Sequence, residues 1–187
     1  MNKLARMFAG TVLVIAVGAG CGRKTEPVAS DAPPRAAAPA DNAAAGSRPG
    51  GQTAEYPALK LPAVDGRMYD LSANRGRWVV VNFWATWCAP CLKEMPDLDA
   101  LGKLRKDIDV VGLAYDDIEP ADMQAFLKMH PVSYPIVIID PYNPPADFAT
   151  PRGLPTTYLI APDGKVAKQF LGPVTAAEIE AAVAAGT

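Results

Sequence analysis

The stretch Trp78-Val-Val-Val-Asn-Phe-Trp-Ala-Thr-Trp-Cys-Ala-Pro-Cys91 decides the fold, because an apolar run leads directly into two closely spaced cysteines. Its first seven residues, to Trp84, are β-branched or aromatic with one exception, Asn82. That composition predicts a strand buried on both faces. The cysteines follow the strand at once, so we expect them at its junction with the next element.

The residues after Cys91 predict a helix that runs to about Lys106, because its apolar residues recur at steps of three. Pro96 lies inside this helix and should kink it, since the proline ring displaces the carbonyl group four residues earlier. The apolar residues are Leu92, Met95, Leu98, Leu101 and Leu104.

The rest of the chain predicts strands and helices around that junction. A short hairpin with Asp65-Gly66 at its turn should precede the strand. Further strands are expected over 110–115, 136–140, 156–161 and 165–171, with helices from Pro120 and over 175–185. The order is hairpin, then βαβαβ, then ββα. It predicts an α/β fold: a central mixed sheet flanked by helices on both faces, with an extra N-terminal hairpin.

Cys88 and Cys91 form a Cys-x-x-Cys pair at the expected start of the helix. A cysteine there faces unpaired backbone N–H groups and the positive end of the helix dipole, which favour the thiolate that attacks disulfides. Two intervening residues place the second sulfur one turn later, close enough to bond to the first. We therefore expect Cys88 to be the exposed attacker and Cys91 the more buried resolver.

Composition argues against two other classes of site. A Cys-x-x-Cys pair can be half of a zinc site, but zinc usually takes four Cys or His ligands. The chain has three cysteines and one histidine, His130, so we expect no metal and interpret His130 as an ordinary residue at a helix end. The net charge of −2 gives no support to a nucleic-acid partner. The acidic cluster Asp116-Asp117-Ile-Glu119 is interpreted as capping the following helix rather than binding metal.

Residues 1–21 have the pattern of a lipoprotein-type signal segment. Two basic residues precede an uncharged, mostly apolar run that is too short to span a membrane. The run ends at Gly18-Ala-Gly-Cys21, which resembles the lipobox of bacterial lipoproteins, where the cysteine is acylated. A lipobox usually has an aliphatic residue at the position of Gly18, so a cleaved signal and an uncleaved anchor remain alternatives. All three place the rest of the chain outside the cytoplasm.

The composition then changes twice along the chain. Residues 22–54 are dominated by Ala, Pro, Gly and small polar residues without apolar periodicity, which predicts a disordered tether. Residues 55–187 carry the periodic segments and form the expected folded domain.

Two motifs give the domain a family resemblance. Residues 79–96, from Val79 through Cys-Ala-Pro-Cys-Leu-Lys-Glu-Met-Pro96, resemble the active-site stretch of the TlpA/ResA-like branch of the thioredoxin superfamily. Gly153-Leu-Pro-Thr-Thr-Tyr-Leu-Ile160 resembles that superfamily's second signature. The resemblance implies a thioredoxin-like fold without a small-molecule cofactor. It makes Pro155 a cis-proline stacked against the cysteine pair, and Leu154 the residue whose backbone meets an extended substrate.

Glu94 follows Cys91 by three residues and should share its helix face. Partial burial would raise the pKa of this carboxyl, so that it could take a proton from Cys91 or return one. The match to the family's Cys-x-x-Glu-x-Pro supports this role, and a solvated surface glutamate is the alternative. Thioredoxin itself uses an acid on the preceding strand, where this chain has Asn82. Trp87, beside Cys88, is assigned to the docking surface, with simple packing as the alternative, and Trp84 to the core.

These features predict an extracytoplasmic thiol–disulfide oxidoreductase that reduces disulfides in exported proteins. The resemblance implies a transmembrane thiol carrier as reductant and offers apocytochrome c as one candidate substrate. Cytochrome-maturation members often have an acidic residue directly after the cis-proline, however, where this chain has Thr156. A disulfide oxidant of the same fold and a non-enzymatic binding module remain alternatives. A peroxidase is disfavoured, because its motif has a proline upstream of the cysteine and no proline stands there in this chain.

Overall fold

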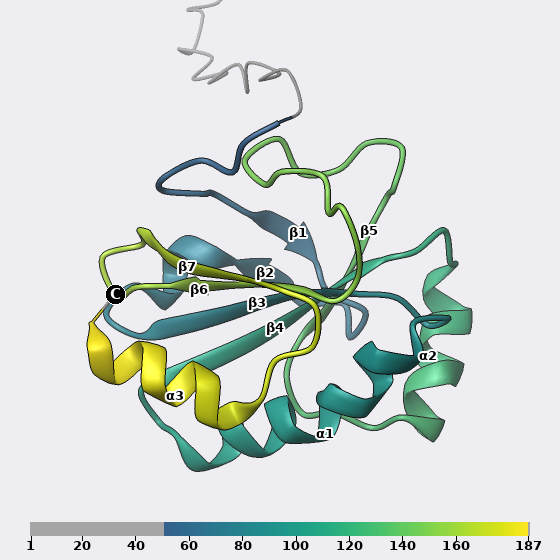
Figure 1. Ribbon diagram of the computed structural model, residues 1–187. Helices are drawn as coiled ribbons and strands as arrows, with labels where there is room; N and C mark the ends of the chain where they lie inside the picture. The colour runs from purple at the N-terminus through teal and green to yellow at the C-terminus, as the bar shows by residue number, and fades with distance from the viewer. Residues whose placement is uncertain (1–50, 187) are drawn as a thin grey trace, which may run out of the picture. The chain divides into compact units, whose positions relative to one another are not determined.

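The computed structural model describes residues 51–186 (Figure 1). The expected signal segment, Cys21 and most of the expected tether lie outside this range. Among the described residues, no helix has both the length and the apolar character needed to cross a membrane.

A five-stranded mixed sheet forms the centre of the domain, in the order β5-β4-β3-β6-β7. Strands β3, β4 and β5 are parallel to one another, whereas β6 runs antiparallel to β3 and β7 antiparallel to β6. The strands are β3 (Trp78–Trp84), β4 (Ile108–Tyr115), β5 (Ile136–Ile139), β6 (Thr156–Ile160) and β7 (Val166–Leu171). The expected mixed sheet is therefore confirmed.

The central strand β3 is buried on both faces, as its composition predicts. Val80 and Trp84 belong to the apolar cluster on one side of the sheet, whereas Val79 and Phe83 belong to the cluster on the other side. Alternate side chains of a strand point to opposite faces, so this strand contributes to both halves of the core.

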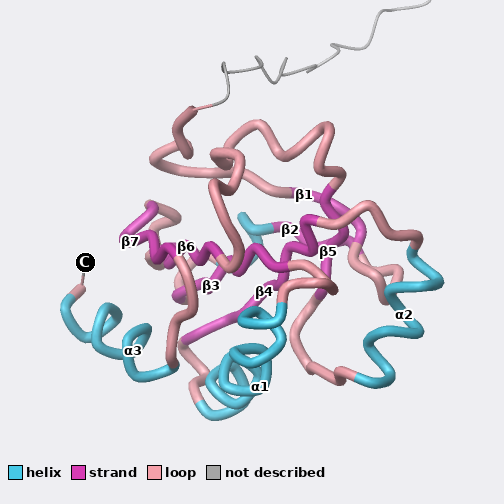
Figure 2. Tube along the Cα trace, turned by 45° about the vertical axis from the view of Figure 1, so that its right-hand side comes forward, coloured by secondary structure: helices cyan, strands magenta, loops and turns pink. Residues whose placement is uncertain are grey.

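All three α-helices pack on one face of the sheet. They are α1 (Ala89–Leu104), α2 (Pro120–Met129) and α3 (Ala176–Ala185), and each contributes to the same apolar cluster. The opposite face is covered by the N-terminal hairpin, the 3₁₀-helix η1 (Leu71–Asn74) and the loop that carries Phe148. Figure 2 shows that loop, between β5 and β6, on the far side of the sheet from α1 and α3.

The expectation of helices on both faces is therefore wrong for the α-helices, and the handedness of the connections explains why. The chain steps in one direction, from β3 through β4 to β5. Right-handed crossovers that step in one direction place both of their helices on the same face. A helix on the other face would need a step in the reverse direction.

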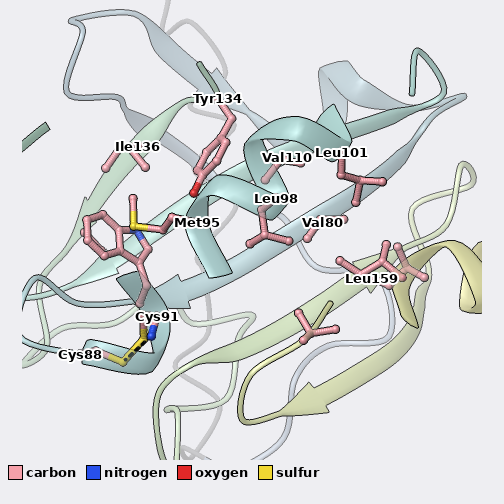
Figure 3. Packing of buried hydrophobic residues seen from close by; sticks show 14 of the residues in the cluster. Val80, Cys88, Cys91, Met95, Leu98, Leu101, Val110, Tyr134, Ile136 and Leu159 are labelled. Atoms are coloured by element: carbon pink, nitrogen blue, oxygen red, sulfur yellow. Dashed lines mark hydrogen bonds between the residues drawn. A yellow bond between two sulfur atoms is a disulfide. The ribbon is translucent and has the colours of Figure 1, made fainter. Parts of the chain in front are cut away.

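Helix α1 buries a narrower stripe than its three-residue pattern indicates. Met95, Leu98 and Leu101 are buried and point into the cluster (Figure 3), whereas Leu104 is 80% exposed. Successive steps of three residues fall short of a full turn by about 60°, so the stripe rotates away from the sheet. Leu104 is also the last helical residue and has no neighbouring turn to cover it.

Strands β1 (Lys60–Pro62) and β2 (Met68–Asp70) pair antiparallel ahead of the main sheet. The turn between them places Gly66 at a φ of 84°, a conformation that favours glycine. An oxygen of Asp65 accepts a hydrogen bond from the backbone N–H of Arg67 and closes this turn.

A short segment ahead of the hairpin is bonded to the far edge of the sheet. The hydroxyl of Thr53 donates to the Tyr158 hydroxyl at 2.9 Å, and the backbone carbonyl of Glu55 accepts from the N–H of Val166, the first residue of β7. The side chain of Glu55 also pairs with Lys165. Thr53 falls within the range that we assigned to the tether, and the division of the chain into segments stays a prediction.

Candidate active site

Cys88 and Cys91 form a disulfide at the N-terminus of α1 (Figure 3). Their Cα atoms are 5.3 Å apart, and Cys88 is the residue that caps the helix: its Sγ accepts a hydrogen bond from the Cys91 N–H at 3.4 Å. The sulfur therefore lies where unpaired N–H groups and the helix dipole favour negative charge. Pro90, in the first turn, removes a donor that would have no partner there.

The two sulfurs differ little in exposure in this disulfide form. Cys88 retains 5% of its exposed area and Cys91 retains none. The order is the one expected, but Cys88 is nearly buried rather than exposed. Its neighbour Trp87 is 69% exposed, so an indole stands at the surface beside the disulfide. Trp84, by contrast, is fully buried, as expected.

The loop before the cysteines is tied to the end of β4. The side chain of Asp116 accepts hydrogen bonds from both the backbone N–H and the hydroxyl of Thr86. The capping position of α2 is occupied by Glu119, whose side chain makes no capping hydrogen bond. The acidic cluster therefore supplies the residue at the capping position, as expected, but no side-chain capping hydrogen bond, and its first member, Asp116, binds the loop before Cys88 instead. His130 ends α2 and stacks on Phe126, with ring centroids 4.4 Å apart.

Glu94 is buried beneath the disulfide, one turn along α1 from Cys91. Only 5% of its area is exposed. Its Oε1 accepts from Nδ2 of Asn82 at 2.8 Å, and its Oε2 accepts from the backbone N–H of Val174 at 2.9 Å. Burial raises the pKa of the Glu94 carboxyl, and the hydrogen bonds from Val174 and Asn82 partly oppose that rise. A solvated surface position for Glu94 is excluded.

The peptide bond between Leu154 and Pro155 is cis. Pro155 is buried, and its carbonyl accepts from the N–H of Gly172. Leu154 packs against the apolar cluster that contains both cysteines. Its backbone N–H and C=O have no hydrogen-bond partner within residues 51–186, which leaves them available to an extended chain.

The site thus combines three features that can be compared with known proteins. A cysteine pair caps a helix, a buried carboxylate follows one turn later, and a cis-proline precedes a strand. A family model described as Redoxin matches residues 49–185. The chain belongs to the Redoxin family.

Individual relatives and solved structures are also similar to this chain. The thiol-disulfide oxidoreductase ResA of Bacillus cereus is 32% identical over 128 residues, which cover 67% of this chain and 73% of that protein. ResA of Bacillus subtilis is 34% identical over 123 residues, which cover 65% and 68%. A Chlorobium tepidum structure described as a thiol:disulfide interchange protein DsbE has a TM-score of 0.59 at 29% identity, covering 72% of this chain and 96% of that one.

Sequence patterns found the cysteines, Glu94 and Pro155 but missed the partners of Glu94. Asn82 was noted as a polar exception in its strand and as the replacement of an acid, but not as a partner of Glu94. Val174 carries no side-chain signal because it acts through its backbone. Within residues 51–186, no group of three or more His, Cys, Asp and Glu side chains could hold a metal ion.

Proposed function

We propose that this chain is a thiol–disulfide oxidoreductase that reduces disulfides in exported proteins through the dithiol of Cys88 and Cys91. The observation that carries the proposal is the disulfide at the N-terminus of α1, with the buried carboxyl of Glu94 one turn behind it. The names of the ResA relatives support the same reaction class.

In the first step the Cys88 thiolate attacks one sulfur of a substrate disulfide. A bond forms between Cys88 and that sulfur, and the other substrate sulfur leaves as a thiolate that takes up a proton. In the second step the Cys91 thiolate attacks Sγ of Cys88 and releases the remaining substrate thiolate. Two electrons have then passed to the substrate, and the protein is left with the Cys88–Cys91 disulfide, the state described above.

Glu94 manages the proton of Cys91 in this scheme. The Cys91 side chain is buried, and a buried thiol loses its proton reluctantly. A carboxylate on the same helix face can accept that proton and return it when the disulfide is reduced again. The raised pKa of Glu94 brings its proton affinity nearer to that of a thiol, which makes the exchange less unfavourable.

Two surfaces beside the disulfide would hold the substrate chain. The free backbone groups of Leu154 can pair with an extended segment, as a strand pairs with a sheet edge. The exposed indole of Trp87 offers an apolar contact for side chains that flank the substrate disulfide. Both features favour an unfolded or extended substrate over a compact one.

The proposal includes a place outside the cytoplasm and an anchor to a membrane. The support is the apolar segment that ends at Cys21, in the pattern of a lipoprotein signal. A reducing partner must regenerate the dithiol, and a transmembrane thiol carrier is the partner that the family resemblance favours. Apocytochrome c is one candidate substrate.

Turnover and potential together test the function. The full chain should reduce insulin disulfides catalytically with dithiothreitol as reductant, and equilibration with glutathione should give a potential near about −250 mV. A potential near about −120 mV would make the chain an oxidant of the same fold. Absence of turnover, with Cys88–Cys91 resistant to reduction in the folded protein, would favour a binding module whose disulfide is structural.

A further inference from the structure

The side chain of Asn82 joins two parts of the candidate site. It is fully buried on β3, and its Nδ2 donates to Oε1 of Glu94 at 2.8 Å and to Oγ1 of Thr157 at 2.9 Å. Glu94 lies on α1, whereas Thr157 lies on β6, two residues after the cis-proline. One amide therefore contacts both the carboxyl behind the cysteines and the strand that leads from Pro155.

Each hydrogen bond that Glu94 makes in this arrangement suits its ionised form. Both carboxylate oxygens accept from N–H donors, one from Asn82 and one from Val174. A protonated carboxyl has an O–H group that must itself find an acceptor. Glu94 is buried, so that acceptor has to come from the protein, and an unmatched O–H would be costly.

The missing acceptor is carried by Asn82. Its Oδ1 is buried and has no hydrogen-bond partner among the described residues. Half a turn about the Cβ–Cγ bond exchanges Oδ1 and Nδ2 without moving the backbone. In the exchanged orientation Oδ1 accepts from the protonated Glu94, and the Thr157 hydroxyl, which can donate as well as accept, turns its hydrogen toward the same oxygen. Nδ2 then takes the position where Oδ1 has no partner among the described residues, so each orientation leaves one amide atom unpartnered.

We propose that Asn82 is a positioning residue for Glu94. The amide of Asn82 donates to the carboxylate of Glu94 through Nδ2, and accepts from its carboxylic acid through Oδ1. The amide orientation then changes each time Glu94 gains or loses the proton exchanged with Cys91. Because Thr157 is bonded to the same amide, the change in amide orientation also alters a hydrogen bond on β6, the strand that follows Pro155. This inference rests on the proton-transfer role of Glu94 proposed above.

None of the other ionisable groups that face Glu94 is hydrogen-bonded to it among the described residues, although the Tyr134 hydroxyl is also buried without a partner there. Cys88 and Cys91, on the same helix, are joined in the disulfide. Tyr134, from the loop before β5, directs its hydroxyl toward α1 (Figure 3). Burial and the nearby charges of Asp99 and Glu94 raise the pKa of this phenol, so it stays neutral while Glu94 titrates. Among the described residues, Asn82 is the only side chain hydrogen-bonded to Glu94, so its amide is the side-chain group in direct contact with the titrating carboxyl.

Nuclear magnetic resonance of the full chain tests the inference without any change to the fold. The Glu94 carboxyl carbon and the Asn82 Nδ2–H₂ resonances are followed across a pH series in the disulfide form. We expect the two amide hydrogens to shift with the midpoint of the Glu94 carboxyl, and to stop shifting in Glu94→Gln. Amide resonances that stay constant while Glu94 titrates would overturn the inference.

Variants add a second measurement. Asn82→Leu removes donor and acceptor at similar volume, and should raise the proton affinity of Glu94 several-fold, because the bond lost by the charged carboxylate is stronger than the bond lost by the neutral acid. Asn82→Ser is the alternative if the leucine variant does not fold, and Asn143→Leu repeats the substitution at an exposed position. An unchanged Glu94 midpoint in folded Asn82 variants would contradict the positioning role.

The pH profile of insulin reduction separates this inference from the proposed function. The part of the pH–rate profile that depends on ionisation of Glu94 should move to higher pH in the folded Asn82 variant. The same Asn82 substitution made in Glu94→Gln should cause no such movement. If Glu94→Gln leaves the profile of the wild type unaltered, the proton role of Glu94 fails, and the resonance titration still decides the behaviour of the amide.

Discussion

Asp116 binds Thr86 twice, because its Oδ2 accepts from the backbone N–H at 2.9 Å and from the hydroxyl at 2.6 Å. Thr86 lies two residues before Cys88, and Asp116 directly follows β4. A carboxylate at the end of one strand thus holds the loop that leads from the neighbouring strand into the cysteine pair. Such a link fixes where the attacking sulfur lies relative to the sheet.

Asp116→Ala should loosen this loop. We expect the free energy of unfolding to fall by about 1–2 kcal/mol, because two hydrogen bonds to a charged group are lost, and insulin reduction to slow several-fold. Urea unfolding and turnover measure the two effects. Asp117→Ala, at the exposed neighbouring position, is the matched control. Equal behaviour of the two variants would show that the Thr86 contact is unimportant.

Cys91→Ser should trap substrates. The variant keeps the attacking sulfur of Cys88 but cannot resolve the mixed disulfide, so adducts accumulate and are seen on non-reducing gels. Cys88→Ser should trap almost nothing, because the remaining sulfur is fully buried. If Cys88→Ser were the variant that trapped substrate, the assignment of attacker and resolver would be reversed.

Glu94 should make stability depend on pH. Burial raises the pKa of its carboxyl in the folded protein above the ordinary 4.5, so the folded state holds the proton more tightly than the unfolded chain. The stabilising contribution is then complete below that ordinary value and is lost as pH rises through the folded-state pKa. Urea unfolding of wild type and Glu94→Gln should diverge across this window, with the wild type losing stability relative to the variant. Parallel curves, like those expected for exposed Glu119→Gln, would exclude this effect.

Trp87→Ala should weaken the handling of protein substrates without weakening the fold. The indole is 69% exposed, so its loss leaves the free energy of unfolding within about 0.5 kcal/mol of the wild type. We expect kcat/KM for insulin to fall roughly tenfold, as for an exposed aromatic contact residue. Tyr142→Ala removes another exposed aromatic ring and is the control. A loss of stability without a change in kcat/KM would favour simple packing.

Cys21→Ser should release the domain from the membrane. Acylation of Cys21 would anchor the wild type, and the variant should appear in the soluble extracytoplasmic fraction. Cys88→Ser should stay with the membrane fraction. Mass spectrometry of the mature wild type is decisive: an unmodified N-terminus at another residue would contradict the anchor.

Local pattern was sufficient for the strand and helix that carry the cysteines, because their chemistry and spacing lie within a few residues. Local sequence pattern could not predict the hydrogen-bond partners of the site residues. Val174 lies 80 residues from Glu94, and Thr157 lies 75 residues from Asn82. Such contacts depend on which strands neighbour each other, and neither residue type signals its partner in advance. The cis bond at Pro155 was expected only through family resemblance, since most X–Pro bonds are trans.

The acidic cluster shows a different limit. Asp116 lies close in sequence to the start of α2, so a capping role follows naturally from the chain order. The parallel pairing of β3 and β4 instead places the ends of both strands side by side, where Asp116 binds Thr86. The sequence offered capping and metal binding as alternatives for this cluster, and the contact of Asp116 with the loop before Cys88 was not among them.

The bonds from residues 53–55 to the far edge of the sheet bear on how the domain can be shortened. Strand β7 is an edge strand of the sheet, and the backbone carbonyl of Glu55 accepts a hydrogen bond from the N–H of its first residue. A truncated protein that begins at Tyr56 would lose this bond, the ion pair with Lys165 and the contact of Thr53 with Tyr158. The lost bond frees one more N–H on an edge strand, and exposed edge groups favour pairing with another copy, so such a protein should self-associate more readily. Soluble versions for crystallisation or assay should start ahead of Thr53.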